Sequence, residues 1–458
     1  MLFHTQTFIF GFLPLVLGVY YSLATRLEAR QWWLIGASLV FYGWWDVRFL
    51  PLLLAQSIGS WLLAEVHFRW HLKWPLVVGV LLNFTALAAF KYLDFVVGLV
   101  EVAIHMPLPR SGLILPIGIS FYTFQVVSYL LDVRRGEAPR YNLRRLMLFV
   151  VLFPHLIAGP IVRHNEIIPQ FAADPLRPGA AERITRGLAL FMLAVAVKVL
   201  LADALARQVE PVFLGAATSI PSVWDAAIAV FVFPLQIFFD FASYTDMAIG
   251  LALMLGFTFP QNFNQPYRSL SLRDFWRRWH MTLSRFLRDY LYIPLGGSRH
   301  GTGTLVRATM ITMGLCGLWH GAGINFVLWG LAHGVGMLAG RLWEEFGRRL
   351  PSVLGWLLTF CFVDLLFTLF RAPDLATALN VWTGLVGAGG LGAHWDSATD
   401  ALVAIGLAIA LLPKPLSSYL QGWLQPARWV AVGLALAATY VLLELGIGAP
   451  TNFIYFQF

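Results

Sequence analysis

The chain has 458 residues, of which 59% are hydrophobic and 12% charged, and its mean hydropathy is +0.71. A soluble domain carries about a quarter charged residues, so this composition excludes an ordinary soluble enzyme. Apolar runs of about 20 residues, the length that crosses a hydrocarbon core, recur along the chain and predict an all-α polytopic membrane protein that contacts lipid. The net charge of +8 falls in no soluble basic domain, so we expect no nucleic-acid partner.

Six apolar segments open the chain, at about residues 7–25, 31–45, 49–66, 74–100, 112–131 and 146–162. The first is expected to be a retained helix, because neither a basic n-region nor a clear cleavage site precedes it. Positive charge collects in alternate gaps, after the first, third and fifth segments: Arg26, Arg30, Arg69, Lys73, Arg134, Arg135, Arg140, Arg144 and Arg145. The positive-inside rule then places the N-terminus outside and these gaps in the cytoplasm.

The middle of the chain contains two irregular apolar segments. Pro154 and Gly159 interrupt the sixth segment, which predicts a broken helix whose freed backbone faces protein or a wet cavity. Further apolar runs follow at 185–203 and 223–256. The second of these is too long for one crossing without strong tilt and contains Pro234, so it is predicted as one strongly tilted helix or two helices. The polar patch from Asp240 to Asp246 lies inside it.

Later apolar segments lie near 305–319, 322–340, 352–370, 401–412 and 428–447, giving about eleven to fourteen helices at about 20 residues per crossing. Neither a short repeat nor a soluble domain is evident, so we predict a single integral-membrane domain over 1–458 with a catalytic core at about 110–345. The two cysteines, Cys316 and Cys361, lie in apolar runs and are expected to be free thiols. Their spacing predicts no metal site.

Residues 272–291 combine apolar side chains at three- and four-residue steps with arginines on the other face. This pattern predicts one amphipathic helix lying in the membrane interface and ending before Pro294. His280 falls about 80° from the centre of the apolar stripe, at its edge. It is either a rim residue of a membrane anchor or a side chain that points toward a buried polar cavity.

His320 is predicted near mid-membrane. It lies 13 residues after Arg307, which should mark the cytoplasmic edge, and that span is roughly 20 Å of helix. Gly321 and Gly323 follow at once, a natural break before the next helix. An imidazole there either bonds a backbone carbonyl or carries chemistry. The helix break favours chemistry for His320, whereas a continuous apolar helix favours a structural role for His333.

The chemistry that needs the fewest additional groups is direct acyl transfer onto a hydroxyl. A neutral imidazole, with a pKa near 6.5, can deprotonate a hydroxyl as it attacks a carbonyl carbon, and a second imidazole can orient the acceptor or polarise the acyl carbonyl. The chain contains no Gly-x-Ser-x-Gly, His-Glu-x-x-His or P-loop motif.

Several longer motifs are similar to those of a known family: residues 153–161, 240–246, 260–267, 274–280, 288–297, 317–321 and 453–458. They resemble the membrane-bound O-acyltransferase (MBOAT) family, in its bacterial alginate O-acetyltransferase-like branch, which is related to the teichoic-acid D-alanyl transfer proteins. The resemblance covers nearly the whole chain. It implies a ring of tilted transmembrane helices, with re-entrant and interfacial helices, around a central tunnel.

The resemblance also implies roles for individual residues. His320 matches the family's catalytic histidine, and His280 matches the second position of the reaction chamber. The expected tunnel and substrate residues are Asp240, Ser243, Tyr244, Asp274, Trp276, Ser284, Trp319 and Asn325. The expected donor entrance contains Arg273, Arg277, Arg278, Arg285 and Arg288, whose charge suits phosphates or an acidic carrier. No permanently bound cofactor is implied; acetyl-CoA or an acyl-carrier thioester is the expected donor.

The implied function is acetyl transfer from a cytoplasmic thioester toward hydroxyls of an exported polysaccharide (alginate-like, cellulose or peptidoglycan) in a bacterial inner membrane. A separate SGNH-type acetyltransferase and polysaccharide machinery are the expected partners. One alternative is carrier-dependent D-alanyl transfer of the teichoic-acid type. Another is a transporter or acyl conduit whose histidines relay protons or line a pore and make no covalent bond. A lipid-linked-sugar glycosyltransferase would need acidic residues in an early outer loop, where Asp46 is the sole candidate.

Overall fold

The computed structural model describes residues 1–347 and 350–423, and within these ranges all regular elements are helices. The predicted segment at 428–447 and the motif at 453–458 lie outside the described residues. By internal contacts the described chain divides into two compact units. The first comprises Met1–Met192 and Tyr244–Pro260, and the second comprises Leu193–Ser243 and the described residues from Gln261 onward.

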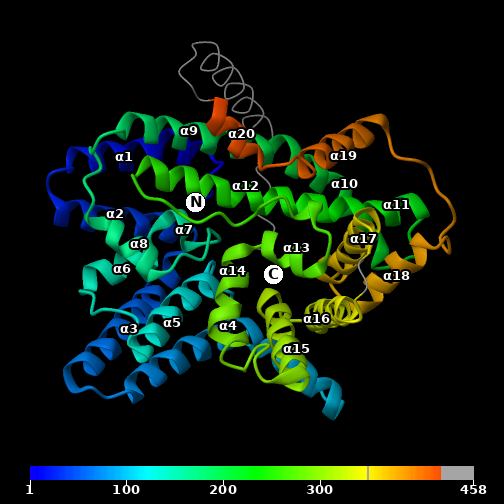
Figure 1. The fold of residues 1–458 in the computed structure, drawn as a ribbon, viewed down its shortest axis with the longest axis horizontal. Helices are drawn as coiled ribbons and strands as arrows, with labels where there is room; N and C mark the ends of the chain where they lie inside the picture. The colour runs from blue at the N-terminus through cyan, green and yellow to red at the C-terminus, as the bar shows by residue number, and fades with distance from the viewer. Residues whose placement is uncertain (348–349, 424–458) are drawn as a thin grey trace. The chain divides into compact units, whose positions relative to one another are not determined.

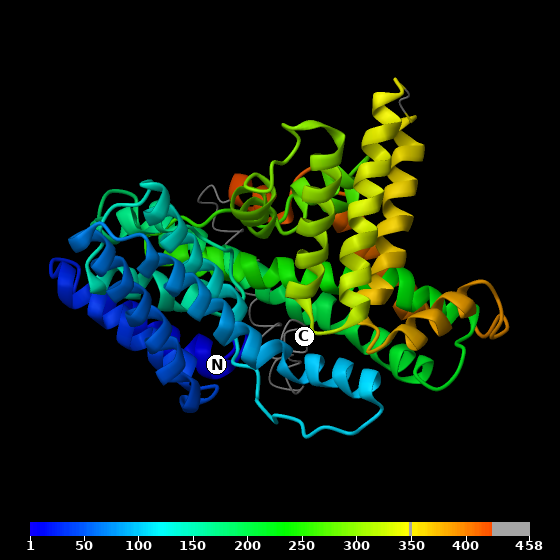
Figure 2. The same ribbon diagram turned by 90° about the horizontal axis from the view of Figure 1, so that it is seen from below.

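The first unit contains the N-terminal helices (Figure 1). They are η1 (Thr7–Phe12), α1 (Leu13–Ser22), α2 (Leu27–Gly43), η2 (Val47–Phe49), α3 (Leu50–Trp70), α4 (Trp74–Ile104), α5 (Ile119–Arg135), α6 (Leu143–Val151), α7 (Phe153–Leu156), α8 (His164–Ile167) and η3 (Ile168–Ala172). The long helices α3, α4 and α5 lie side by side (Figure 2). These helices agree with the predicted apolar segments, except that the fifth begins only after the prolines of the 105–118 connection.

The sixth predicted segment is broken as expected. Helix α6 ends at Val151, and α7 begins at Phe153 with Pro154 in its first turn, where a missing N–H is tolerated. The N–H of Phe153 donates to the hydroxyl oxygen of Ser38 at 3.0 Å. A side chain of α2 therefore satisfies a backbone group that the break releases, as a buried helix break requires.

The second unit contains the later helices. They are η4 (Lys198–Ala202), α10 (Asp203–Ala216), α11 (Val223–Ala227), η5 (Ile228–Val232), η6 (Pro266–Arg268), α13 (Leu272–Arg278), α14 (Met281–Leu287), η7 (Arg288–Tyr292), α15 (Gly301–His320), α16 (Ile324–Glu345), α17 (Ser352–Arg371), α18 (Leu375–Leu385), α19 (Ser397–Ala410) and α20 (Leu416–Trp423). The described chain passes between the units within α9 (Ala180–Val197), within α12 (Phe233–Met254) and between Pro260 and Gln261.

Within the described chain, five helical stretches are long and apolar enough to cross a membrane: Val47–Trp70, Trp74–Ile104, Ala180–Ala216, Val223–Met254 and Ser352–Arg371. The protein is an all-α polytopic membrane protein, as predicted. The run at 223–256 forms one helical stretch and not two. Pro234 is the second residue of α12, two residues after the π-helical turn Ile228–Val232, where the hydrogen-bond register is already shifted, so the helix continues through it.

Helices α15 and α16 approach each other unusually closely, and this contact fixes the end of α15 (Figure 2). A Cβ atom added at Gly317 would lie 2.1 Å from the carbonyl oxygen of Phe326. One added at Gly330 would lie 2.1 Å from the carbonyl oxygen of Met313. Small residues allow such backbone contact between membrane helices. Two glycines therefore set the position of His320, the last residue of α15.

Candidate active site

The stretch at 272–291 is broken at its centre. Helix α13 ends at Arg278 and α14 begins at Met281, and between them His280 adopts a left-handed conformation with φ 42° and ψ 53°. The prediction of one continuous helix is therefore wrong. Periodicity records which side chains face the core, and it does not detect one left-handed residue between two short helices that share a core.

A neighbouring irregular segment, residues 262–264, supplies the hydrogen bonds at this break. The N–H of Met281 donates to the carbonyl oxygen of Asn262 at 2.9 Å, and the N–H of Asn264 donates to the carbonyl oxygen of Arg278 at 2.9 Å. The side chain of His280 between them is fully buried. His280 is therefore an interior residue and not the rim of an interfacial anchor.

The side chain of Asn262 determines which nitrogen of neutral His280 carries the proton. Its Oδ1 accepts hydrogen bonds from the backbone N–H of Thr282 at 3.2 Å and from the Thr282 hydroxyl at 2.9 Å, which identifies this atom as the oxygen. His280 Nδ1 lies 3.2 Å from the same oxygen and donates to it. A neutral imidazole has one N–H, so Nε2 carries the lone pair. Among the described residues Nε2 has no hydrogen-bond partner.

His320 ends α15 inside a cluster of aromatic rings. Its side chain is 3% exposed, and its ring centroid lies 4.9 Å from that of Trp319, 5.3 Å from that of Trp329 and 5.1 Å from that of Phe370. The helix stops here, and α16 resumes at Ile324. The predicted break after His320 is confirmed.

The structure brings the two predicted histidines together. The ring centroids of His280 and His320 are 6.4 Å apart, with the rings inclined at 60°. Phe241 lies edge-on to His280 at 4.7 Å, and Trp319 contacts it at 6.1 Å. The two rings that the resemblance assigns to one reaction chamber therefore lie close together. Water-excluded surroundings strengthen the electrostatic effect of each imidazole on a bound substrate.

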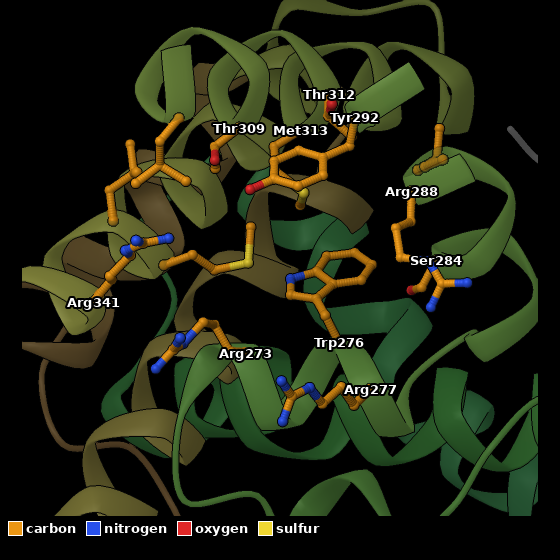
Figure 3. Close-up of a pocket in the computed structure, with 14 residues that line it drawn as sticks. Arg273, Trp276, Arg277, Ser284, Arg288, Tyr292, Thr309, Thr312, Met313 and Arg341 are labelled. Atoms are coloured by element: carbon orange, nitrogen blue, oxygen red, sulfur yellow. The ribbon is translucent and has the colours of Figure 1, made fainter. Parts of the chain in front are cut away.

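A cavity of about 330 Å³ lies in the same unit (Figure 3). Four arginines line it, Arg273, Arg277, Arg288 and Arg341. The remaining lining is mainly apolar or hydroxylic: Trp276, Ser284, Leu287, Tyr292, Leu305, Thr309, Thr312, Met313, Met337 and Leu338. Such a cavity can hold a drug-sized anion with an apolar portion. The hydrogen bond from Arg288 to Asp289 holds the pKa of Arg288 above its ordinary value.

Two indole rings connect the cavity wall to His320. Trp276 is one of the lining residues (Figure 3), and its N–H donates to His333 Nδ1 at 3.4 Å. Trp276 contacts Trp329 at a centroid distance of 5.8 Å, and Trp329 contacts His320 at 5.3 Å. Because His333 accepts the hydrogen bond from Trp276, it orients this indole ring, in agreement with its predicted structural role. The cavity lining itself includes neither His320 nor His280.

The predicted donor arginines divide into two groups. Arg273, Arg277 and Arg288 line the cavity, whereas Arg278 and Arg285 do not. Arg278 instead pairs with Asp274 one turn earlier, at 2.9 Å. Arg341 completes the cavity from α16, and sequence reasoning missed it because it lies outside the arginine-rich stretch.

The predicted tunnel residues are spread over several environments. Trp319 touches both imidazoles, and Ser284 and Trp276 line the cavity. The Asn325 amide donates to the carbonyl oxygens of Leu369 and Ala372 at 3.0 and 2.7 Å, and so closes the end of α17.

Asp240, Ser243 and Tyr244 follow one another on α12, but they do not share one environment. The Ser243 hydroxyl donates to the Asp240 carbonyl oxygen at 3.0 Å within the second unit. Tyr244 belongs to the first unit, where its ring stacks on Phe3 at 4.9 Å. Their roles in substrate binding stay predictions.

Sequence reasoning missed Asn262 and Trp329 as parts of the histidine site. Asn262 lies in the motif at 260–267 that resembles the family, but its contact with His280 depends on the left-handed break. Trp329 lies nine residues after His320 on α16, so a pattern confined to one helix does not connect them. Within the described part of the chain, no group of three or more His, Cys, Asp or Glu side chains could hold a metal ion.

Membrane-spanning helices, two adjoining buried imidazoles and an arginine-lined cavity define a site of the kind expected in a membrane acyltransferase. Residues 59–370 match the MBOAT, membrane-bound O-acyltransferase family. The chain belongs to this family, and its chemistry is that of an O-acyltransferase.

Three relatives illustrate the range of the family near this chain. A probable alginate O-acetylase AlgI of Pseudomonas aeruginosa is 40% identical over 84% of this chain and 75% of its own length. A peptidoglycan O-acetyltransferase of Helicobacter pylori is 36% identical over 85% of this chain and 81% of its own length. A teichoic acid D-alanyltransferase of Bacillus subtilis is 27% identical over 57% of this chain and 70% of its own length.

Proposed function

We propose that this chain moves an acetyl group from a cytoplasmic thioester toward hydroxyl groups of an exported polysaccharide. The observation that carries the proposal is the pair of buried imidazoles with ring centroids 6.4 Å apart. The names of the relatives that acetylate alginate and peptidoglycan support a polysaccharide as the final acceptor.

His320 is the general base in this proposal. Its imidazole takes the proton of the acceptor hydroxyl as the oxygen attacks the thioester carbonyl carbon. The carbon–sulfur bond breaks, and the proton passes to the leaving thiolate, so the products are the ester and the free thiol. His280 Nε2, whose lone pair is set by Asn262, accepts a hydrogen bond that orients the acceptor.

The arginine-lined cavity is the proposed donor site. Arg273, Arg277 and Arg341 offer planar guanidinium donors that match phosphate oxygens, as acetyl-CoA requires. The apolar side of the cavity, with Met313 and Met337, suits the uncharged arm of the donor. The acetyl end would approach His320 past Trp276.

A carrier-protein thioester is the second candidate donor. The relative named as a teichoic acid D-alanyltransferase favours it, and the same arginines suit an acidic carrier surface. Purified protein offered labelled acetyl-CoA and labelled acyl-carrier protein in separate reactions distinguishes the two. We expect acetyl-CoA alone to lose its label.

The proposed setting is a bacterial inner membrane with the N-terminus in the periplasm. A separate SGNH-type acetyltransferase receives the group and modifies the polymer, together with the polysaccharide machinery.

The deciding experiment is His320→Ala in a proteoliposome assay that follows labelled acetyl groups from acetyl-CoA to an acceptor. We expect loss of transfer with unchanged insertion and thermal unfolding, whereas His67→Ala, at a half-buried histidine near the end of α3 in the first unit, should behave as wild type. Full transfer by His320→Ala would reject the assigned base. Transport of label without a new ester bond would instead support an acyl conduit.

A further inference from the structure

A buried ion-pair cluster lies in the second unit, outside the cavity. Lys198 is 3% exposed, and its Nζ lies 2.6 Å from Asp203 Oδ1 and 2.7 Å from Asp240 Oδ1. Asp203 and Asp240 are also buried. Ionisable groups inside membrane helices are costly, and they are usually functional.

A π-helical turn places the first pair. In an α-helix, residues five apart lie about 140° apart around the axis, so Lys198 and Asp203 would diverge. Here η4 spans Lys198–Ala202, and the N–H of Asp203 donates to the carbonyl oxygen of Lys198. The wider turn brings the two side chains onto one face. π-Helical turns of this kind occur frequently at functional sites.

The second pair joins this stretch to α12 next to the histidine site. Asp240 is followed by Phe241, whose ring lies edge-on to His280 at 4.7 Å and 85°. Phe241 also contacts Phe263 at 5.2 Å, and Phe263 contacts Trp279 at 5.1 Å, beside His280. One helical step therefore separates the ion pair from the ring that packs on the imidazole.

We propose that Lys198 is a positioning residue for acyl transfer. Its ammonium fixes α12 through Asp240, and the fixed helix holds Phe241 against the His280 ring. Lys198 itself does not line the donor cavity. The inference rests on the proposed function, because it assigns His280 a part in turnover.

The test removes all charge from the cluster at once, because Lys198→Met alone would leave two buried carboxylates without their cation. In the Lys198→Met/Asp203→Asn/Asp240→Asn variant we expect kcat to fall about 10- to 100-fold, the effect of a small misplacement near the reacting atoms. KM for acetyl-CoA should stay unchanged, because the donor arginines are untouched. If the triple variant does not fold, Asp240→Leu cuts the same link and keeps the Lys198–Asp203 pair.

The matched control is another buried polar link between helices. Gln56 Nε2 donates to Asn83 Oδ1 at 3.1 Å between α3 and α4. Gln56→Leu/Asn83→Leu should change the temperature of thermal unfolding, whereas kcat should stay equal to that of wild type.

A double-mutant cycle separates positioning from general stability. Phe241→Leu should lower kcat by itself, and neutralising the cluster in that background should cost less than about twofold more, because both changes act through the same ring. If the effects of Phe241→Leu and of the neutralised cluster on kcat multiply instead, the positioning role is overturned. A folded triple variant with full kcat would overturn it as well. His320→Ala in the same assay keeps the two hypotheses apart, because full activity there rejects the proposed function whatever the cluster variants do.

Discussion

At His280 the backbone conformation and the ring chemistry are coupled. A non-glycine residue in the left-handed region costs of order 1–3 kcal/mol, and here φ is 42°. The backbone bond from Met281 to Asn262 offsets this cost, and the Asn262 side chain sets the ring tautomer. One asparagine therefore holds both the strained backbone and the lone pair of Nε2.

Asn262→Leu should lower kcat by about 10²-fold, within the range that a positioned acid–base group contributes. Without the Asn262 oxygen, the neutral ring of His280 can carry its proton on Nε2 instead of Nδ1, and Nε2 then loses its lone pair. KM for the donor should change little. Asn264→Ala is the control, since the Asn264 side chain is exposed and its backbone bond to Arg278 remains. Steady-state kinetics of both variants, with thermal unfolding measured in parallel, check the prediction. Equal kcat values for Asn262→Leu and wild type would contradict it.

The arginines of the cavity should act on donor binding and not on the chemical step. Arg277→Gln and Arg341→Gln should each raise KM for acetyl-CoA about tenfold, the value of one charge-assisted hydrogen bond, and salt should reduce the difference. Arg186→Gln is a control, because this half-exposed residue pairs with Glu182 and lies away from the cavity lining. Kinetics at two ionic strengths test this, and a loss confined to kcat would argue against a donor site here.

At the scale of helices, the close packing of α15 against α16 sets the position of His320, and substitutions of single glycines test this packing. Gly317→Ala or Gly330→Ala would force a Cβ onto a backbone oxygen at 2.1 Å, and overpacking of this kind costs about 1–3 kcal/mol. We expect both variants to unfold at lower temperature and to lose turnover, because the end of α15 must move. Gly340→Ala, also on α16 but with open space around it, should retain activity and stability. Unchanged activity in all three would mean that helix spacing does not set the site.

The sequence predicted the apolar helices and the break after His320, because both follow from local features: runs of apolar residues, and glycines directly after the histidine. It did not predict the break at His280, because the side chains on both sides of the left-handed residue face one core and preserve the helical period. Arg341 was missed for a different reason. Its place in the cavity depends on how α16 packs against α13, and that packing leaves no pattern within α16 itself.

At the scale of the whole molecule, the proposed chemistry requires a fixed orientation in the membrane, because the donor is cytoplasmic and the polymer is exported. The charge pattern makes a definite prediction for the connections on either side of α5. The connection before it carries Pro107 and Pro109 with few positive charges, whereas the one after it carries Arg134, Arg135 and Arg140. The positive-inside rule therefore places the connection after α5 in the cytoplasm.

Cysteine labelling in intact cells tests this orientation, and the chain suits the method because only Cys316 and Cys361 must first be replaced. Ser111 and Glu137 are both exposed; Ser111 lies in the connection before α5, and Glu137 lies in the connection after it. A membrane-impermeant maleimide should label Ser111→Cys in intact cells and Glu137→Cys only after permeabilisation. The reverse pattern would place the arginine-rich connection outside. That result would also count against the proposed direction of transfer.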